Sequence, residues 1–334
     1  MNYRKLGSSA LQVSELCLGT MMFGDQTEAA EGGNIVALAR ERGVNFVDTA
    51  DVYSNGGSEA MLGPLIKADR DRWVLATKVG NKMSERPNEW RYSRKWIVRS
   101  VTDSLRRLGT DYLDIYYLHR DFEDDPLEEP LRALDDLIRA GHIRAFGLSN
   151  FRGWRIAEAV RVAGKIGMPG PIVCQPYYNL LNRVPEVEVL PACDHYGVGV
   201  AAYSPIARGV LTGKYQPNQP PPDQSRAGRG DKRLHQTEWR TESLEIAQRL
   251  AQHAQARGSG VVQFAVAWLL ANRIVTSVIA GPRTLAQWQD YFPALDYPWT
   301  GEDEALVNSL VAAGHPSTPG YSDPAYPIAG RKAR

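Results

Sequence analysis

A lysine, an aspartate and a tyrosine lie in the sequence where they can act together in proton transfer. Lys78 ends an apolar run, and its ammonium group, once buried, needs an anionic partner. Asp48 ends the preceding apolar run and can supply that partner, and Tyr53 follows it closely. A lysine next to a phenol favours the phenolate and so lowers the pKa of the tyrosine. The pattern therefore predicts that Tyr53 is a general acid, because an ordinary phenol with a pKa of about 10 holds its proton too tightly near neutral pH.

His119 ends a further apolar run and can complete a polar pocket that hydrogen-bonds a carbonyl oxygen. Taken singly, Tyr53 could be a loop tyrosine, His119 a satisfied core histidine and Lys78 half of a structural ion pair. Taken together and in this order, they favour a proton-transfer site. The remaining histidines have no paired carboxylate or cysteine pattern, so we expect no metal site; they are His142, His195, His235, His253 and His315.

Eight short apolar runs, separated by stretches of helical period, must position these side chains. Continuous apolar runs are typical of parallel strands that are covered on both faces. Strands that alternate with helices indicate βαβ units, and eight of them favour a closed (β/α)8 TIM barrel over an open doubly wound sheet. The predicted strands are 16–18, 45–48, 73–78, 113–118, 145–149, 173–175, 198–203 and 277–279. The predicted helices are 29–42, 58–66, 93–108, 126–140, 154–164, 187–195, 242–257, 261–270 and 285–291.

Three segments fall outside this alternation. Residues 3–15 predict a small hairpin that could plug the floor of the barrel. Residues 216–241 are rich in Pro, Gln, Gly and Arg, and a loop of this length is usually a functional lid or disordered, so we expect a long mobile loop. Residues 314–334 predict an irregular tail. Because no linker separates these parts, residues 1–334 are expected to form a single domain with long loops on the C-terminal side of the barrel.

The bulk composition argues against nucleic-acid and membrane partners. Lys+Arg 39 against Asp+Glu 38 gives a net charge of +1, which offers no electrostatic footprint for either. The apolar stretch 261–281 contains Gln263, Asn272 and Arg273, which are costly in lipid, so it predicts a buried helix, a turn and a strand. The N-terminus lacks the apolar region of a signal peptide. Three cysteines without metal spacing indicate reduced thiols, and we expect a cytoplasmic protein; they are Cys17, Cys174 and Cys193.

Several motifs resemble the aldo-keto reductase superfamily. The segment 43–59, which holds Asp48 and Tyr53, resembles the family signature around its catalytic Asp and Tyr, and Lys78 and His119 match the family's Lys and His in order. Further matches are LRRLGTDYLD (105–114), GLSNF (147–151), YSP (203–205) and GVLTGKY (209–215). The resemblance covers about residues 3–291. It implies that Tyr53 protonates the carbonyl oxygen or acts as the base in reverse, that Lys78 tunes its pKa, that Asp48 holds the lysine, and that His119 orients the carbonyl.

The resemblance also implies a nicotinamide cofactor, NADPH or NADP+. Ser149, Asn150 and Gln175 would bind the carboxamide, and Tyr203 would stack on the nicotinamide ring. Lys214 is a candidate for the pyrophosphate. The rest of the implied cofactor cradle is Gly19, Thr20, Met21, Asp48, Ser204, Pro205, Ile206 and Gly209.

The adenine end is expected at residues 281–291, GPRTLAQWQDY, which resemble the family segment Gly-x-Arg/Ser-x-x-x-Gln-x-x-Glu-Asn. Arg283 near a helix N-terminus would suit a ribose 2′-phosphate, which favours NADPH and leaves NADH as an alternative. Gly281, Gln287 and Asp290 are the other expected contacts. Tyr291 stands where the family has Asn, and Asp290 where it has Glu, so this end departs from the family pattern.

The implied substrate is a small aldehyde or ketone, or an alcohol in the reverse direction. The candidate pocket residues are Met22, Phe23, Trp90, Asp121 and Phe122. Trp90 and Phe122 suggest an apolar or ring-bearing substrate. The basic cluster Arg226, Arg229, Lys232 and Arg233 is either a solvated loop or a clamp over the cofactor phosphates, and Tyr321 and Tyr326 either line the pocket or pack a terminus.

Other functions stay open at this point. The motifs resemble bacterial reductases and also a branch of the superfamily that serves as regulatory subunits of membrane channels, so an NADPH-binding subunit with feeble turnover is an alternative. A cofactor-free barrel enzyme such as an isomerase is another. The segment 197–202 fits G-x-G-x-x-A, but it runs into a strand and then Pro205, which disfavours a Rossmann fold. The sequence leaves the oligomeric state open.

Overall fold

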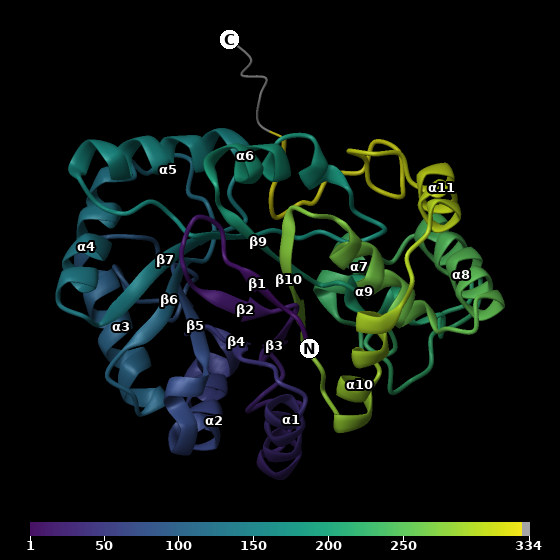
Figure 1. Cartoon of the computed structure of the whole chain (residues 1–334), viewed down its shortest axis with the longest axis horizontal. Helices are drawn as coiled ribbons and strands as arrows, with labels where there is room; N and C mark the ends of the chain where they lie inside the picture. The colour runs from purple at the N-terminus through teal and green to yellow at the C-terminus, as the bar shows by residue number, and fades with distance from the viewer. Residues whose placement is uncertain (329–334) are drawn as a thin grey trace.

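Eight parallel strands close into a barrel in the computed structural model, which describes residues 1–328 (Figure 1). The order around the barrel is β10-β3-β4-β5-β6-β7-β8-β9, with each strand hydrogen-bonded to its neighbours. The strands are β3 (Leu16–Gly19), β4 (Phe46–Asp48), β5 (Val74–Val79), β6 (Leu113–Leu118), β7 (Ile143–Ser149), β8 (Val173–Gln175), β9 (Gly199–Tyr203) and β10 (Val275–Ala280). The (β/α)8 prediction is confirmed, and the bounds agree within a few residues.

The helices surround the barrel as predicted, and local signals explain several of their ends. The side chain of Ser93 accepts a hydrogen bond from the amide of Trp96 and so caps α3, and Gly109 ends the same helix with φ 63°. The helix predicted over 126–140 begins at Glu128, so Pro126 lies two residues before α4 and not in its first turn. The helices of the barrel are α1 (Ala29–Glu41), α2 (Gly57–Ile66), α3 (Arg94–Leu108), α4 (Glu128–Arg139), α5 (Gly153–Ile166), α6 (Val189–Tyr196), α8 (Thr241–Ala256), α9 (Val261–Ala271) and α10 (Leu285–Gln289).

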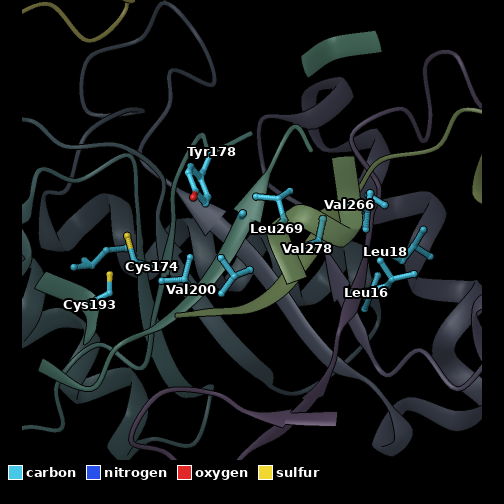
Figure 2. Close-up of a cluster of buried hydrophobic side chains, with 14 of the residues drawn as sticks. Leu16, Leu18, Cys174, Tyr178, Cys193, Val200, Val266, Leu269 and Val278 are labelled. Carbon is cyan, nitrogen blue, oxygen red and sulfur yellow. The ribbon is translucent and has the colours of Figure 1, made fainter. Parts of the chain in front are cut away.

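The core has two layers because successive residues of a strand face opposite sides of the sheet. Leu16 and Leu18 of β3 face outward, and Figure 2 shows them in a cluster that includes Val266 and Leu269 of α9. Cys17, between them, faces the barrel interior, where it packs in a second cluster that includes Phe46. Both layers consist of buried, mainly apolar side chains, so the polar residues at the strand ends stand on a rigid base.

The N-terminal hairpin is present and closes the floor of the barrel. It consists of β1 (Tyr3–Lys5) and β2 (Gln12–Ser14), and it lies across the centre of the barrel in Figure 1. Leu6 and Val13 are fully buried in the inner cluster. Gly7 approaches the amino-terminal ends of β8 and β9 so closely that a Cβ atom would lie 2.5 Å from the Ile172 oxygen.

Two helices were not predicted. Within 216–241, α7 (Lys232–Thr237) begins after Asp231, whose side chain caps it by accepting from the amide of Leu234. Leu234 is fully buried and anchors the segment, so it is not simply a loop. The second, α11 (Gly301–Leu310), begins with a capping box between Thr300 and Asp303.

The tail after α11 has no helix or strand as far as residue 328, as predicted; residues 329–334 lie outside the described part. Over the described residues, the helices are too short or too polar to span a membrane, and the apolar stretch 261–281 divides into α9 and β10.

Candidate active site

The ends of β4 and β5 bring Asp48 and Lys78 together beneath a cavity of about 410 Å³ at the C-terminal end of the barrel. Lys78 is fully buried, and its Nζ atom pairs with Oδ1 of Asp48. The same Nζ atom donates to the Thr49 carbonyl at 2.7 Å and to the Tyr53 hydroxyl at 3.3 Å. The three donors of the ammonium group are therefore all satisfied, one of them by the phenol that faces the cavity.

The surroundings favour the charged form of Lys78, whereas burial disfavours the charged form of Asp48. Burial acts to lower the pKa of Lys78, but Asp48 and Tyr53 outweigh it, and the net direction is upward. Burial raises the pKa of Asp48, against the opposing effects of Lys78 and of Gln175, whose Nε2 donates to the second carboxylate oxygen at 2.9 Å. A buried charge pair whose hydrogen bonds are all made is a stable feature, whereas either charge alone would be costly there.

Tyr53 begins the short helix η1 (Tyr53–Gly56) and lines the cavity. Burial raises the pKa of Tyr53, and this effect exceeds the opposing effect of Lys78. Lys78 was expected to bring this pKa below its ordinary value. That expectation is wrong in its net direction, because the fold buries Tyr53 so deeply that the effect of burial outweighs that of the lysine charge. Tyr53 thus carries its proton at neutral pH, and Lys78 is placed to stabilise the phenolate once the proton leaves.

His119, at the end of β6, lines the same cavity with its ring edge-on to Tyr53, 5.9 Å between ring centroids. Burial lowers the pKa of His119 well below its ordinary value, and Lys78 and Arg120 act in the same direction, so the imidazole is neutral. Its Nδ1 atom is buried without a hydrogen-bond partner among residues 1–328. An unpaired buried acceptor costs less than an unpaired buried N–H, so the proton is better placed on Nε2. His119 can then donate to an oxygen in the cavity.

The three predicted amide-binding residues form one network at the ends of β7 and β8. Asn150 donates to the His119 carbonyl and to Ser149 Oγ, both at 3.0 Å, and accepts from the Tyr203 hydroxyl at 2.8 Å. Ser149 Oγ donates to the Gln175 carbonyl at 3.1 Å. The network leaves one N–H of Gln175 and acceptor capacity on the amide oxygens of Asn150 and Gln175. These are the groups that a primary carboxamide requires.

The backbone beside this network is held in an uncommon conformation. Asn150 and Ser204 both have φ 60°, and Ala207 and Arg208 have φ 48° and 53°. Positive φ at residues other than glycine is unfavourable and gathers at functional sites. The turn that holds Ala207 and Arg208, η4 (Ala207–Thr212), therefore keeps its strained shape because the surrounding fold imposes it.

The other predicted cofactor residues also line this cavity. They are Gly19, Thr20, Met21, Pro205, Ile206, Gly209, Lys214, Gly281, Arg283, Gln287 and Asp290. At the outer end, however, the helix N-terminus that was expected to assist Arg283 is occupied: Glu31 accepts from the amide of Leu285 at 2.6 Å, and Thr284 caps α10. Arg283 supplies the cationic side chain at this end of the cavity.

Four of the five predicted substrate-pocket residues do not line the cavity. Met22 lines it, but Phe23 is fully buried in the outer core cluster. Asp121 is paired with Arg155 at 2.9 Å. Trp90 and Phe122 stack edge-to-face on each other, 5.9 Å apart, away from the cavity. Their positions depend on loop conformations that sequence spacing does not determine.

Some residues that line the cavity were missed or left open. Tyr326 and Ala325 of the tail form part of its wall, whereas Tyr321 donates its hydroxyl proton to the Gln236 carbonyl instead. From the basic cluster, Arg226, Arg229 and Arg233 line the cavity and Lys232 does not. Lining residues without any prediction include Gln26, Val52, Asn81, Arg208 and Thr212, and Tyr291, at the expected adenine end, lines the cavity as well. Arg208 could have been noted, because it interrupts the motif 203–215 with a charge.

The donor set of the cavity fits a nicotinamide dinucleotide. An amide network and the Tyr203 ring lie at the inner end, beside Tyr53 and His119. Cationic side chains lie along the cavity toward Arg283, where a pyrophosphate and a 2′-phosphate would need them. Neutral, aromatic and cationic groups thus occur together in one cavity in the combination that such a cofactor needs.

Comparison with known proteins agrees with this reading of the geometry. The family model described as "Aldo/keto reductase family" matches residues 15–312. A protein of Arabidopsis thaliana named "Probable voltage-gated potassium channel subunit beta" is 37% identical over 89% of this chain and 92% of its own. The "Uncharacterized oxidoreductase YrpG" of Bacillus subtilis (strain 168) is 35% identical over 96% and 98%. The "L-glyceraldehyde 3-phosphate reductase" of Escherichia coli (strain K12) is 34% identical over 94% and 93%.

The family match covers most of the chain, and relatives above 30% identity extend over nearly its full length. The closed parallel barrel with its N-terminal hairpin is the fold that the match implies. Oxidoreductases stand among these relatives, and the family generally uses nicotinamide cofactors. This chain belongs to the aldo/keto reductase family.

Proposed function

We propose that the protein is an NADPH-dependent reductase that converts an aldehyde or ketone to an alcohol, with Tyr53 as the general acid. The observation that carries this proposal is the position of Lys78, which is buried between Asp48 and the Tyr53 hydroxyl at the floor of the cavity. A structural ion pair would not need a phenol directed at the cavity as its third partner. A proton donor that must leave an anion behind does need this arrangement.

In this mechanism the neutral Nε2–H of His119 and the Tyr53 hydroxyl both hydrogen-bond the carbonyl oxygen and so fix its position. The reduced nicotinamide, when bound, supplies the hydride that the carbonyl carbon receives. Tyr53 gives its proton to the oxygen as negative charge develops on it. The remaining phenolate lies 3.3 Å from the Lys78 ammonium, which stabilises it. In the reverse direction the same phenolate removes the proton of an alcohol.

The amide network and Tyr203 would orient the nicotinamide. Gln175 links the two parts of the site, because its side chain also donates to Asp48. Cofactor position and the ion pair that supports Tyr53 are thereby joined through one residue. Arg283 favours NADPH over NADH, because a guanidinium can bind a 2′-phosphate in bidentate fashion.

The test is a titration of the protein with NADPH and NADH, followed by quenching of tryptophan fluorescence, and then a panel of aldehydes and ketones followed by nicotinamide absorbance. We expect tight NADPH binding and turnover. Tyr53→Phe should bind NADPH nearly as well and lose carbonyl reduction by at least about a hundredfold. Undiminished reduction by Tyr53→Phe would overturn the proposed role.

A regulatory binding protein is the second candidate, favoured by the names of several relatives as potassium channel subunits. The same titration separates the two functions. Tight NADPH binding without turnover of any carbonyl compound, or of any alcohol with NADP+, would support the regulatory function. Absence of binding to either cofactor would contradict both and favour a cofactor-free barrel enzyme.

A further inference from the structure

The cavity has more positive charge than its own carboxylates balance. Its cationic lining residues are Arg208, Lys214, Arg226, Arg229, Arg233 and Arg283, and its acidic ones are Asp48 and Asp290. Asp48 is paired with Lys78, and two of the arginines, Arg226 and Arg233, form ion pairs with residues outside the lining, Asp231 and Asp323. Within residues 1–328, Arg208, Lys214, Arg229 and Arg283 have no carboxylate partner. A ligand of this cavity should therefore be strongly anionic.

Three of these unpaired cations lie where the cofactor phosphates are expected. Arg283 follows β10. Arg229 donates to Gln26, in the loop after β3, at 2.8 Å. Lys214 lies beside Gly209: a Cβ atom added to this glycine would lie 3.6 Å from the Nζ atom of the lysine. The barrel order makes β10 and β3 neighbours, so Arg283 and Arg229 both belong to that side of the mouth.

Arg208 extends in a different direction. Its guanidinium lies 5.8 Å from the centre of the Tyr177 ring, in the loop after β8, and its Nε donates to Thr237 of α7 at 3.2 Å. The Tyr177 ring packs on Tyr203, 5.5 Å between centroids. Tyr203 is the residue proposed to stack on the nicotinamide. The guanidinium thus lies near α7 and the loop after β8, next to the ring that packs on Tyr203, whereas Arg229 contacts the loop after β3 and Arg283 follows β10.

The fold holds Arg208 in this position at some cost. Its backbone has φ 53°, and its amide donates to Ser204 Oγ at 3.2 Å. Thr237, which receives the guanidinium, is itself buried and donates to the Arg233 carbonyl at 2.6 Å. An arginine in a strained turn, half-buried and without a carboxylate, is costly unless a ligand uses its charge.

The tail contacts further arginines of the barrel next to the cavity wall. Tyr326 forms part of the wall, and its carbonyl accepts from Arg152 at 3.3 Å. The guanidinium of Arg120 lies 5.6 Å from the Tyr326 ring. Burial raises the pKa of the Tyr326 hydroxyl, whereas Arg120, Arg233 and Arg208 act against it. The carboxylates among these neighbours are already held by arginines: Asp323 by Arg233 and Glu123 by Arg152.

We propose that the substrate of this site is a small aldehyde or ketone that carries an anionic group, a phosphate or a carboxylate, and that Arg208 binds this group. The inference rests on the proposed reductase function and adds the substrate class to it. A guanidinium matches the geometry of both anions, since each accepts two parallel N–H bonds. The anion would provide the charge partner that Arg208 lacks, while Tyr53 and His119 hold the carbonyl oxygen.

The test compares anionic and neutral substrates of matched shape at saturating NADPH. One pair is 4-carboxybenzaldehyde and 4-methylbenzaldehyde; the other is glyceraldehyde 3-phosphate and glyceraldehyde. The wild-type protein should prefer the anionic member of at least one pair by about tenfold or more in kcat/KM. The pair with the larger preference distinguishes a carboxylate from a phosphate as the bound group.

Arg208→Met should lower kcat/KM for the preferred anionic substrate by about 10- to 100-fold, mainly through KM, and change the neutral partner by less than about threefold. Arg208→Gln keeps a donor for Thr237 without the charge and should give the same result, which excludes loss of the turn as the cause. Arg229→Met is the contrasting variant. It should weaken NADPH binding and affect both members of a pair equally below cofactor saturation.

Several outcomes would overturn the inference. The wild-type protein could show no preference for either anion, or Arg208→Met could leave that preference unchanged. Arg208→Met could instead raise the Kd of NADPH and slow both members of each pair alike, which would assign Arg208 to the cofactor. If NADPH binds but no carbonyl compound is reduced, the proposed reductase function is rejected, and the proposed substrate class is rejected with it. If only the neutral compounds are reduced, the reductase function stands and the proposed substrate class alone is rejected.

Discussion

Lys78 holds Tyr53 by a hydrogen bond of 3.3 Å while its charge is neutralised by Asp48. One buried ammonium group thus serves both the fold and the proposed chemistry. Its loss would leave the Asp48 carboxylate buried without a counter-ion, and would also leave the Tyr53 phenolate without stabilisation. Stability and activity should therefore respond differently to single and double replacement of this pair.

Lys78→Met should lower the free energy of unfolding by about 3–5 kcal/mol, because the uncompensated charge of Asp48 stays buried. Carbonyl reduction should fall by at least about a hundredfold, because nothing then offsets the effect of burial on the pKa of Tyr53. Urea unfolding and steady-state kinetics measure the two effects. The double variant Asp48→Asn/Lys78→Met is the control: it should recover most of the stability and none of the activity. Recovery of both would show that the pair is structural only.

Asp51 predicts a pH dependence of stability. Burial raises the pKa of this carboxyl to about 7, and the neighbouring Glu59 acts in the same direction. The folded state therefore binds a proton that the unfolded state has released, so the free energy of unfolding falls as pH rises from about 4 to about 7. Asp51→Asn removes this dependence. Its stability relative to the wild-type protein should increase from pH 5 to about pH 7 and then level off.

Urea unfolding at a series of pH values checks this expectation. Asp111→Asn, at an exposed position, is the control and should parallel the wild-type curve. Glu238 is also buried, with its pKa raised to about 8, so a part of the wild-type dependence should persist in Asp51→Asn. A curve for Asp51→Asn that runs parallel to wild type across the whole range would show that Asp51 is ionised in the folded protein.

The barrel, and the meeting of Asp48, Tyr53, Lys78 and His119 at one end of it, could be predicted because each leaves a local signal. Apolar runs report parallel strands, and a charge at the end of such a run, as at Lys78, has few explanations other than a site. α7 left almost no signal, because it is short and Leu234 is its main apolar anchor. α11 left a clear signal in the sequence, the capping box of Thr300 and Asp303, although this helix was not among those predicted.

The features that could not be predicted depend on how deeply a side chain is buried and on the conformation of the loops. Phe23 and Met22 are adjacent in sequence, yet one packs in the core and the other faces the cavity. The pKa of Tyr53 depends on how deeply the barrel buries it, and the spacing of residues in the sequence does not indicate this depth. Tyr326 lies at the cavity where long-range contacts, among them those of Arg152 and of the Arg233–Asp323 pair, hold the tail. Each of these contacts joins residues far apart in the chain.

The hairpin plug predicts a large effect at Gly7. This residue has φ 57°, and a Cβ atom would lie 2.5–2.6 Å from backbone atoms of Ile172, Gly197 and Gly199. Gly7→Ala should cost about 1–2 kcal/mol for the backbone conformation and a further 1–3 kcal/mol or so for the overlap. Gly109→Ala is the matched control, since its φ is 63° and nothing lies within 4 Å. Thermal unfolding of both variants checks this, and equal losses would show that the hairpin yields without cost.

Arg283 predicts how strictly the site distinguishes NADPH from NADH. Glu31 accepts from the amide of Leu285 and Thr284 from that of Gln287, and the Arg283 guanidinium is the cationic donor at this end of the cavity for a 2′-phosphate. Arg283→Ala should weaken NADPH binding by about 10- to 100-fold and change NADH binding by less than about threefold. Fluorescence titration of both cofactors measures this, with the exposed Arg273→Ala as a control that should bind both like wild type. An equal loss for both cofactors would place Arg283 at the pyrophosphate or adenine instead, and the preference for NADPH would then have to come from the other cations of the cavity.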